Sequence, residues 1–421
     1  MSDNFQAAAS SQPEKNVLML VNTHVYDDPR VISEGASLAQ AGYNVRIIGA
    51  ARQGGLPVQD TIRGMNVLLT PMVTEARPLP LLRALWRWLR GDIGKITQTP
   101  QSPKTNMVSF LFFNLWALRV GMKMPADIIH AHDLSPLPVA WLLARWRRAP
   151  LIYDAHESAP DFYTGLKGRL VAKLEKALIG KPDAVITVGE RLARALRERG
   201  AKRVIVIGNW KRLEQFTLDA QRLETKCHEL GLERKQLVIS YIGALETDRA
   251  IQPLLDAVEQ SPNVTLLMGG RGSQQAAVEA AANRSRNIRW LGWVDMAEIP
   301  TYTHLSDAVY YCLSISQDSQ ADLNVDNNYY STPNKLFEAF AAGKAIIARR
   351  GIGEIGEILE QIPAGILLDE VTPKTLKAAF KQLENPATLK RLQEAALAAR
   401  EHYHWGMAEE RLRQLYDELI Q

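Results

Sequence analysis

The chain has 421 residues, 46% of them hydrophobic, with a formal net charge of +4. This length suits two domains of about 200 residues that each bury a core, and the small charge excess gives no indication of a nucleic-acid partner. The two cysteines, Cys227 and Cys312, lack metal-ligand spacing, which excludes a disulfide scaffold and predicts a reducing compartment.

Residues 1–15 are polar and lack the basic start and long apolar run of a signal peptide, so they predict a disordered tail. The longest apolar stretch, 107–122, contains Asn114 and Arg119 and falls short of the ~20 apolar residues that a membrane span needs. We therefore expect a soluble, cytoplasmic protein and leave open a peripheral contact with the inner face of the plasma membrane.

Short apolar runs alternate with helical patterns along most of the chain. The first set of runs comprises 17–21, 45–50, 65–70, 127–132, 150–155, 184–188 and 204–208, and the second comprises 237–243, 264–270, 288–293, 308–314, 344–348 and 365–369. This alternation predicts an α/β fold in which helices cover both faces of parallel sheets. We place one doubly wound, Rossmann-like domain at 16–208, a polar linker at 209–236 and a second domain at 237–401. Ligands of such sheets bind at the carboxyl ends of the strands, here in a cleft between the domains.

The segment 81–124 combines seven Lys or Arg residues, a single acid (Asp92) and several Trp and Phe residues. One interpretation is a helix packed on the first domain, followed by a surface loop. The interpretation that we favour is an interfacial patch that contacts anionic lipid. The same combination of side chains recurs nearby at Trp141, Arg145, Trp146, Arg147 and Arg148.

A predicted helix at 333–343 starts at Pro333 and ends at Gly343. Its first-turn N–H groups, near Asn334 and Lys335, and the helix dipole form an anion site. Glu338 lies one turn further on and could accept hydrogen bonds from vicinal hydroxyls. A site for phosphate at the helix start and a site for ribose one turn further on predict a nucleoside diphosphate as the ligand. The alternative is a surface pair between Lys335 and Glu338, worth only about 0.2–0.5 kcal/mol.

The stretch NYYSTPNKLFEAFAAGKAII (328–347) resembles the signature of the retaining glycosyltransferases of family four, which have the GT-B fold. The resemblance covers nearly the whole chain in the family's order. It includes YIGALETDRAIQPLLDA and LLMGGRGS in the donor domain, and DDPRVISEGASLAQAGYNVRIIG, DIIHAHDLSPLP and LIYDAHES in the acceptor domain. The last helix, 402–421, is expected to cross back onto the first domain. The Pro-Asn-Lys variant looks like a bacterial branch that builds surface polysaccharides.

The resemblance implies that backbone amides at the helix start bind the donor's diphosphate and that Glu338 holds its ribose. The expected donor-binding residues are Gly243, Gly270, Arg271, Pro333, Asn334, Leu336 and Glu338. Arg249 and Lys335 would stabilise the leaving phosphate, and His132, at the end of a strand in the first domain, is the leading candidate to contact the transferred sugar. The expected acceptor-binding residues are Asp28, Arg30, Asp133, His156 and Glu157. Asp28 could equally cap the helix that Pro29 begins.

Two positions depart from the family's pattern. Tyr330 stands where many relatives have a sugar-binding glutamate, and Ala244 stands where many have an arginine. Arg271 and Lys335 are the candidates to supply the missing cation. No Asp-x-Asp metal motif stands out, because Asp318, Asp322 and Asp326 are typical of a solvated loop. We therefore expect a metal-independent, front-face transfer without cofactor.

The function that we predict is transfer of a sugar from a nucleoside-diphosphate sugar, with UDP or GDP as the nucleotide, to a glycan or lipid-linked acceptor in cell-surface polysaccharide biosynthesis. A nucleotide-sugar epimerase of the same fold is an alternative, although the Pro-Asn-Lys signature fits that class poorly. A non-catalytic, nucleotide-sugar-binding scaffold is a second alternative, which the departures at Ala244 and Tyr330 leave open.

Overall fold

The computed structural model describes residues 15–51, 59–70, 107–163, 165–232, 236–313 and 329–420. Three predictions fall wholly or mostly outside these ranges: the disordered tail, the basic, aromatic segment before residue 107, and the solvated loop that contains Asp318, Asp322 and Asp326. None of the described helices is both long enough and apolar enough to cross a membrane.

The first domain contains a sheet of eight strands in the order β3-β4-β2-β1-β5-β6-β7-β8. All neighbouring strands are parallel except β3, which runs antiparallel to β4 at the edge. The strands are β1 (Asn16–Val21), β2 (Asn44–Ala50), β3 (Gln59–Ile62), β4 (Met65–Thr70), β5 (Ile128–His132), β6 (Leu151–Ala155), β7 (Ala184–Thr187) and β8 (Val204–Val206). The helices between them are η1 (Val25–Asp27), α1 (Pro29–Gln40), α3 (Met107–Gly121), α4 (Leu137–Arg147), η2 (Ala159–Phe162), α5 (Gly165–Leu178) and α6 (Glu190–Glu198).

The second domain contains a parallel sheet of six strands in the order β11-β10-β9-β12-β13-β14. Its strands are β9 (Leu237–Ala244), β10 (Val264–Arg271), β11 (Ile288–Trp290), β12 (Ala308–Tyr311), β13 (Ala345–Arg349) and β14 (Gly365–Leu368). Its helices, with those of the preceding linker, are η3 (Leu213–Phe216), α7 (Ala220–Glu229), η4 (Thr247–Arg249), α8 (Ile251–Glu259), α9 (Gln275–Arg284), α10 (Ile299–Leu305), α12 (Asn334–Ala342), α13 (Ile355–Gln361), α14 (Pro373–Leu383) and α15 (Pro386–Arg400). The predicted α/β class with two doubly wound sheets is confirmed.

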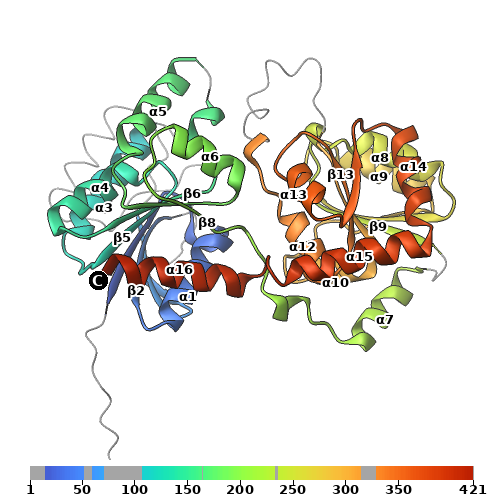
Figure 1. The fold of residues 1–421 in the computed structure, drawn as a ribbon, viewed down its shortest axis with the longest axis horizontal. Helices are drawn as coiled ribbons and strands as arrows, with labels where there is room; N and C mark the ends of the chain where they lie inside the picture. Colours follow the sequence, from blue (N-terminus) through green and yellow to red (C-terminus); the bar gives the residue numbers. More distant parts are fainter. Residues whose placement is uncertain are drawn as a thin grey trace, which may run out of the picture.

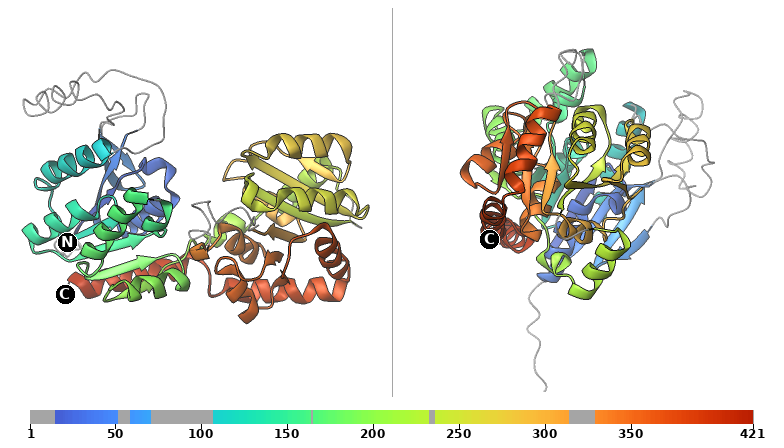
Figure 2. Two further views of the ribbon diagram at one scale, coloured as in Figure 1. Left: turned by 90° about the horizontal axis from the view of Figure 1, so that it is seen from above. Right: turned by 90° about the vertical axis from the view of Figure 1, so that its right-hand side faces the viewer.

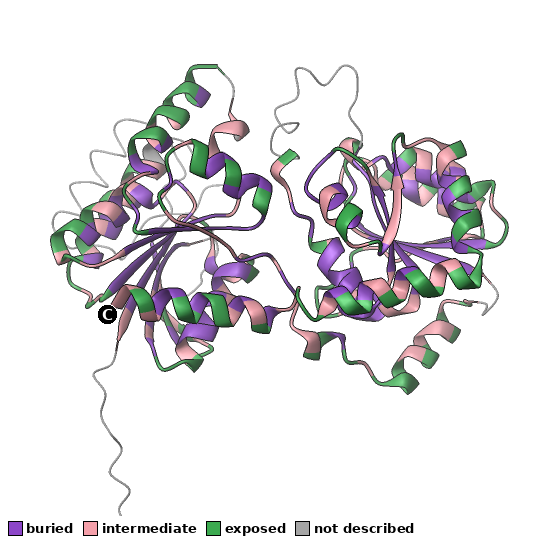
Figure 3. Ribbon diagram, viewed as in Figure 1, coloured by how far each residue is buried: buried purple, intermediate pink, exposed green. Residues whose placement is uncertain are grey.

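Helices cover both faces of each sheet, which explains why the central strands are continuously apolar (Figures 1 and 3). On β1, Val17, Met19 and Val21 pack into one core, whereas Leu18 and Leu20 pack into a second core on the opposite face. This period of two residues is the pattern expected of a strand that is buried on both sides. Because all strands except β3 run parallel, their carboxyl ends lie at one edge of each sheet.

Two crossings of the chain connect the domains. The first follows β8, and the second joins α15 to the last helix, α16 (Trp405–Ile420), which lies against the first domain (Figures 1 and 2). There Tyr416 Oη lies 2.8 Å from His130 Nδ1, and Tyr43 Oη donates to Asp417 Oδ1 at 2.8 Å. The two crossings meet at a parallel bridge between Lys211 and His404.

Candidate active site

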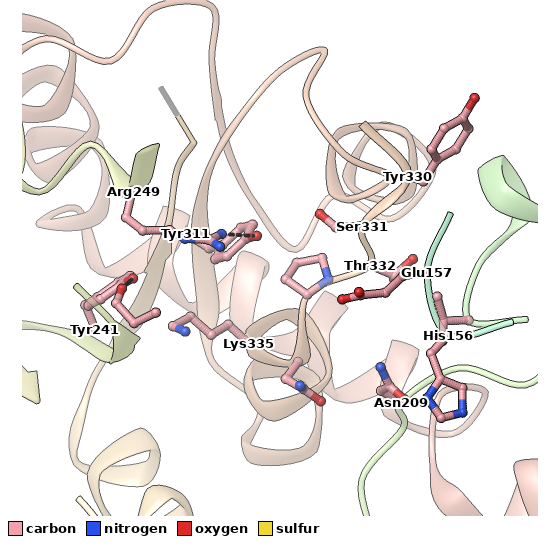
Figure 4. A pocket seen from close by; sticks show the side chains of 14 residues that line it. His156, Glu157, Asn209, Tyr241, Arg249, Tyr311, Tyr330, Ser331, Thr332 and Lys335 are labelled. Atoms are coloured by element: carbon pink, nitrogen blue, oxygen red, sulfur yellow. Dashed lines mark hydrogen bonds between the residues drawn. The ribbon is translucent and has the colours of Figure 1, made fainter. Parts of the chain in front are cut away.

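A pocket of about 290 Å³ lies between the two domains (Figure 4). The first domain and its crossing supply the side chains at one end of the pocket: His156, Glu157, Val188 and Asn209. The second domain supplies the rest: Tyr241, Ala244, Arg249, Tyr311, Tyr330, Ser331, Thr332, Pro333, Asn334 and Lys335. These residues follow the carboxyl ends of strands in both sheets, which is where doubly wound folds bind their ligands.

The start of α12 forms one wall of the pocket. The helix begins at Asn334, one residue later than the sequence predicts, because Pro333 is its N-cap. Pro333 offers no side chain that could cap the helix, and its carbonyl accepts from the Leu336 amide at 3.2 Å, so the amides of Asn334 and Lys335 are the ones left for an anion. Behind them the helix is anchored by apolar packing: Leu336 is fully buried in the core, so its side chain contributes to packing and not to the pocket.

Glu338 lies one turn into α12 and is only 9% exposed. Its Oε1 forms an ion pair at 3.3 Å with Lys211 Nζ, which also donates to Asn334 Oδ1 at 2.8 Å. The sequence did not identify Lys211, because this residue is distant along the chain. A surface pair of Lys335 and Glu338, the alternative left open by the sequence, is wrong: the carboxylate is nearly buried, and its ion-pair partner comes from the domain crossing.

Lys335 and Arg249 bring positive charge to the pocket. The Lys335 ammonium lies 4.8 Å from the ring centroid of Tyr241, and Arg249 Nη1 donates to Tyr311 Oη at 3.0 Å. Burial lowers the pKa of Lys335 to about 8, a shift that Glu338 opposes and the nearby Arg249 reinforces. Two cations close together in a partly buried site are the arrangement expected where a polyanion binds.

Gly243 makes room for the lysine, and Gly270 makes room for the backbone of Gly243. A Cβ at Gly243 would lie 2.4 Å from Lys335 Nζ, and a Cβ at Gly270 would lie 1.8 Å from the carbonyl oxygen of Gly243. Arg271 follows Gly270 and pairs in register with Ala244, but its guanidinium lies 4.5 Å from the ring centroid of Trp293 and does not line the pocket. Lys335 is therefore the better placed of the two candidates for the cation that is missing at Ala244.

On the first domain, the histidine that reaches the pocket is His156. His132 ends β5 but is fully buried, and its Nδ1 lies 3.3 Å from His156 Nε2. The prediction that His132 faces the cleft is therefore wrong in this structure: the residue lies behind His156, because the last residue of a central strand remains inside the domain. His156 follows β6 by one residue and extends into the opening.

Asp154, which sequence reasoning missed, organises this group. It accepts two bonds from Arg30, from Nε at 2.7 Å and from Nη2 at 3.0 Å, and its Oδ2 lies 3.1 Å from His156 Nε2. Arg30 also forms an ion pair with Glu34 at 3.1 Å and donates to the carbonyl of Ile207 at 2.7 Å. The predicted acceptor contact by Arg30 is not available, because its guanidinium is buried and engaged. A charged residue inside the apolar run LIYDA was the signal for Asp154.

Three further acceptor candidates surround His156. Asp28 caps α1 by accepting from the amides of Arg30 and Val31, as the alternative for this residue predicted. Asp133 has a left-handed backbone, with a φ of 65°, and accepts from the His156 amide at 3.3 Å. Its carboxylate and that of Asp28 lie 3.7 and 3.9 Å from His156 Nδ1. Glu157 lines the pocket beside them.

These carboxylates determine the charge of the histidine. Burial lowers the pKa of His156, but the neighbouring Asp133 and Asp154 overcome that effect and raise it to about 10. Burial raises the pKa of Glu34 to about 8, and the negative charge of Asp154 adds to the shift. Burial also holds the pKa of His130 well below its usual value. The site therefore presents a charged imidazolium, His156, to the pocket at neutral pH.

One buried group among the described residues has the side chains of a metal site: Glu34, His130, His132 and Asp154, whose ligand atoms lie within 4.8 Å of one another. Arg30 already forms ion pairs with both carboxylates of this group. A metal ion would have to enter a fully buried space beside that guanidinium. The prediction that the reaction uses no metal stays a prediction.

A second connection between the domains borders the pocket. Glu354 accepts from the amide of Glu190 at 2.6 Å and from Thr332 Oγ1 at 2.6 Å, so one carboxylate joins the start of α6 to the segment before α12. Arg191 Nε donates to Glu357 Oε1 at 3.0 Å beside it. These contacts were not predicted, since each joins residues that are far apart in the sequence.

The two doubly wound sheets, with a cationic pocket between them, define a protein of the GT-B class. Residues 30–210 match the glycosyl transferase 4-like domain, and residues 236–385 match the glycosyl transferases of group 1. The chain belongs to this family of glycosyltransferases.

Curated relatives agree with this assignment, and solved structures share the fold. The chain is 24% identical to glycogen synthase of Mycobacterium tuberculosis, over 64% of the chain and 63% of that protein's length. It is 23% identical to the phosphatidyl-myo-inositol mannosyltransferase of the same species, over 69% of the chain and 73% of the relative. Sucrose-phosphate synthase from Thermosynechococcus elongatus superimposes with a TM-score of 0.70 at 17% identity, covering 96% of this chain and 99% of that one. Anabaena HepE in complex with UDP-glucose gives a TM-score of 0.65 at 14% identity, covering 96% and 99%.

Proposed function

We propose that the protein is a retaining glycosyltransferase that moves a sugar from a nucleoside-diphosphate sugar to a glycan or lipid-linked acceptor in cell-surface polysaccharide biosynthesis. The observation that carries the proposal is the wall formed by α12. Its uncapped start and Lys335 line the pocket and suit a diphosphate, and the nearly buried Glu338, one turn further along the helix and behind this lining, suits a ribose. The HepE structure with UDP-glucose favours UDP as the nucleotide, and GDP is the next candidate.

The reaction breaks the bond between the anomeric carbon and the diphosphate oxygen. The acceptor oxygen forms its new bond on the same face of the sugar, and its proton passes to the departing phosphate. Negative charge then builds on the β-phosphate, where Arg249, Lys335 and the amides of α12 stabilise it. This chemistry uses the chain's own cations and does not call on a metal ion.

On the opposite wall, the imidazolium of His156 and the carboxylate of Glu157 are placed to bind hydroxyls of the sugar or the acceptor. We assign the direct contact to His156. His132 acts behind it by fixing the ring, since its Nδ1 lies 3.3 Å from His156 Nε2. Asp133 holds the backbone of His156 and shares the acceptor side of the pocket.

A lipid-linked acceptor is supported by the outer surface of the first domain. Helices α3 and α4 pack side by side and expose Leu111, Leu115, Leu142 and Trp146. Beside them lies a hollow of about 420 Å³ whose lining includes Arg145, Arg148 and Lys181. Apolar side chains next to cations suit a bilayer with anionic headgroups, so we propose peripheral contact with the inner face of the plasma membrane. The mannosyltransferase relative, named for a phosphatidylinositol, fits this reading.

The test is product analysis by NMR with UDP-glucose or GDP-mannose and a polyprenyl-linked saccharide in liposomes. Transfer predicts free nucleoside diphosphate and an α-linked product that preserves the donor's anomeric configuration. An altered sugar that is still attached to the nucleotide would favour the epimerase. An intact donor that binds without reacting would favour the scaffold.

A further inference from the structure

Lys211 belongs to the crossing between the domains. Its carbonyl accepts from the Trp405 amide at 2.9 Å, and the bridge to His404 joins the outgoing and returning segments of the chain. The backbone of Lys211 is therefore held where the two crossings meet.

The side chain of Lys211 reaches the second domain. Its ammonium contacts Asn334 Oδ1 at 2.8 Å and Glu338 Oε1 at 3.3 Å, and the side chains of Lys211 and Glu338 are only 21% and 12% exposed. Hydrogen bonds that involve charged groups are stronger than neutral ones, and low exposure reduces their screening by solvent. Lys211, from the crossing, thus contacts two residues of α12, Asn334 and Glu338.

This contact has two consequences for the pocket. First, it engages Oε1 of Glu338, whereas Oε2 has no hydrogen-bond partner among the described residues, so this oxygen remains for a ligand hydroxyl. Second, its positive charge neutralises the negative charge of the Glu338 carboxylate, which lies three residues after Lys335 on the same helix. Without Lys211, the nearest cation for that carboxylate would be Lys335, which would then be drawn away from the diphosphate.

We infer that Lys211 is a positioning residue of the donor site: from the domain crossing it orients Glu338 toward the ribose hydroxyls and leaves Lys335 for the diphosphate. The inference rests on the proposed function, because it needs a nucleotide whose ribose meets Glu338. It also makes ribose recognition depend on the geometry of the crossing, since the orienting group belongs to neither sheet.

The experiment is calorimetric titration of the full chain with UDP and with 2′,3′-dideoxy-UDP, or with the corresponding GDP pair if GDP is the nucleotide that binds. The variants are Lys211→Met, Lys211→Arg and, as a control, Lys202→Met, which removes an exposed lysine just before β8. The measured quantity is the ratio of the two dissociation constants, which isolates the contribution of the ribose hydroxyls.

We expect the wild type to prefer the ribonucleotide by at least about tenfold, the low end of the range for one hydrogen bond to a charged group. Lys211→Met should reduce the preference to less than about threefold, and Lys211→Arg and Lys202→Met should retain it. A general structural defect would weaken the binding of both nucleotides and leave the ratio of dissociation constants unchanged, and that result would overturn the inference. An unchanged ratio with unchanged affinities would also overturn it. A wild type without any ribose preference would instead contradict the assignment of α12 as the donor site.

Discussion

The lowered pKa of Lys335 makes nucleotide binding sensitive to pH. With a pKa of about 8 in the free protein, the lysine is about nine-tenths protonated at pH 7 and about one-tenth protonated at pH 9. A bound diphosphate stabilises the charged form, so binding above pH 8 must include uptake of a proton. His156, whose pKa is about 10, keeps its charge across this interval and does not contribute to the change.

The affinity for UDP or GDP should therefore fall about tenfold between pH 7 and pH 9, which corresponds to about 1.4 kcal/mol. Calorimetry in buffers of different ionisation enthalpy should report uptake of most of one proton at pH 9. The Lys335→Met variant keeps the aliphatic chain but has no proton to lose, so it should bind more weakly at pH 7 with an affinity that hardly changes up to pH 9. A wild-type affinity that is flat from pH 7 to pH 9, or a variant that keeps the full pH dependence, would refute the reasoning.

Three further results are expected. Asp154→Asn removes the carboxylate that accepts two bonds from the buried Arg30 and leaves Glu34 as its ion-pair partner, so it should lower the free energy of unfolding by up to about 3–5 kcal/mol in urea titrations; a loss below about 1 kcal/mol would show that the pair is not structurally important. The ion pairs of His156 stabilise the fold fully below its unfolded pKa of about 6.5, and this contribution is lost as the pH rises through its folded pKa of about 10. The melting temperature of the wild type should therefore fall over this pH interval more than that of His156→Gln. The same fall in both proteins would contradict the prediction. Trp146→Glu should reduce sedimentation with anionic liposomes at low salt several-fold, whereas Met296→Glu, on the second domain, should not; equal sedimentation of both variants would exclude the α3–α4 face as the docking surface.

The order of elements was predictable because strands buried on both faces are continuous apolar runs, as in VLMLV and AVITV. The edge strand β3 was missed, since three of the four residues of Gln59–Ile62 are polar and the strand pairs only with β4. The start of α12 was predicted to within one residue, because Pro333 marks it locally. Local chemistry of this kind can be read without knowledge of the tertiary fold.

The parts of the site that were missed depend on distance along the chain. Arg30 and Asp154 are 124 residues apart, and Lys211 and Asn334 are 123 residues apart, so no local pattern joins them. The sequence also does not show how deeply a side chain is buried. His132 ends one apolar strand and His156 follows the next, but only the structure shows that the first lies inside the domain and the second reaches the pocket.

The central claim, that α12 binds the nucleotide of the donor, is tested most directly by titrating the wild type and Glu338→Ala with UDP, GDP, ADP and dTDP without added metal. The account predicts that one nucleotide binds the wild type and that the variant loses at least about tenfold in affinity for it. If no nucleotide binds, or if the variant binds as tightly as the wild type, Glu338 serves only as the partner of Lys211, and the scaffold becomes the better explanation of this chain.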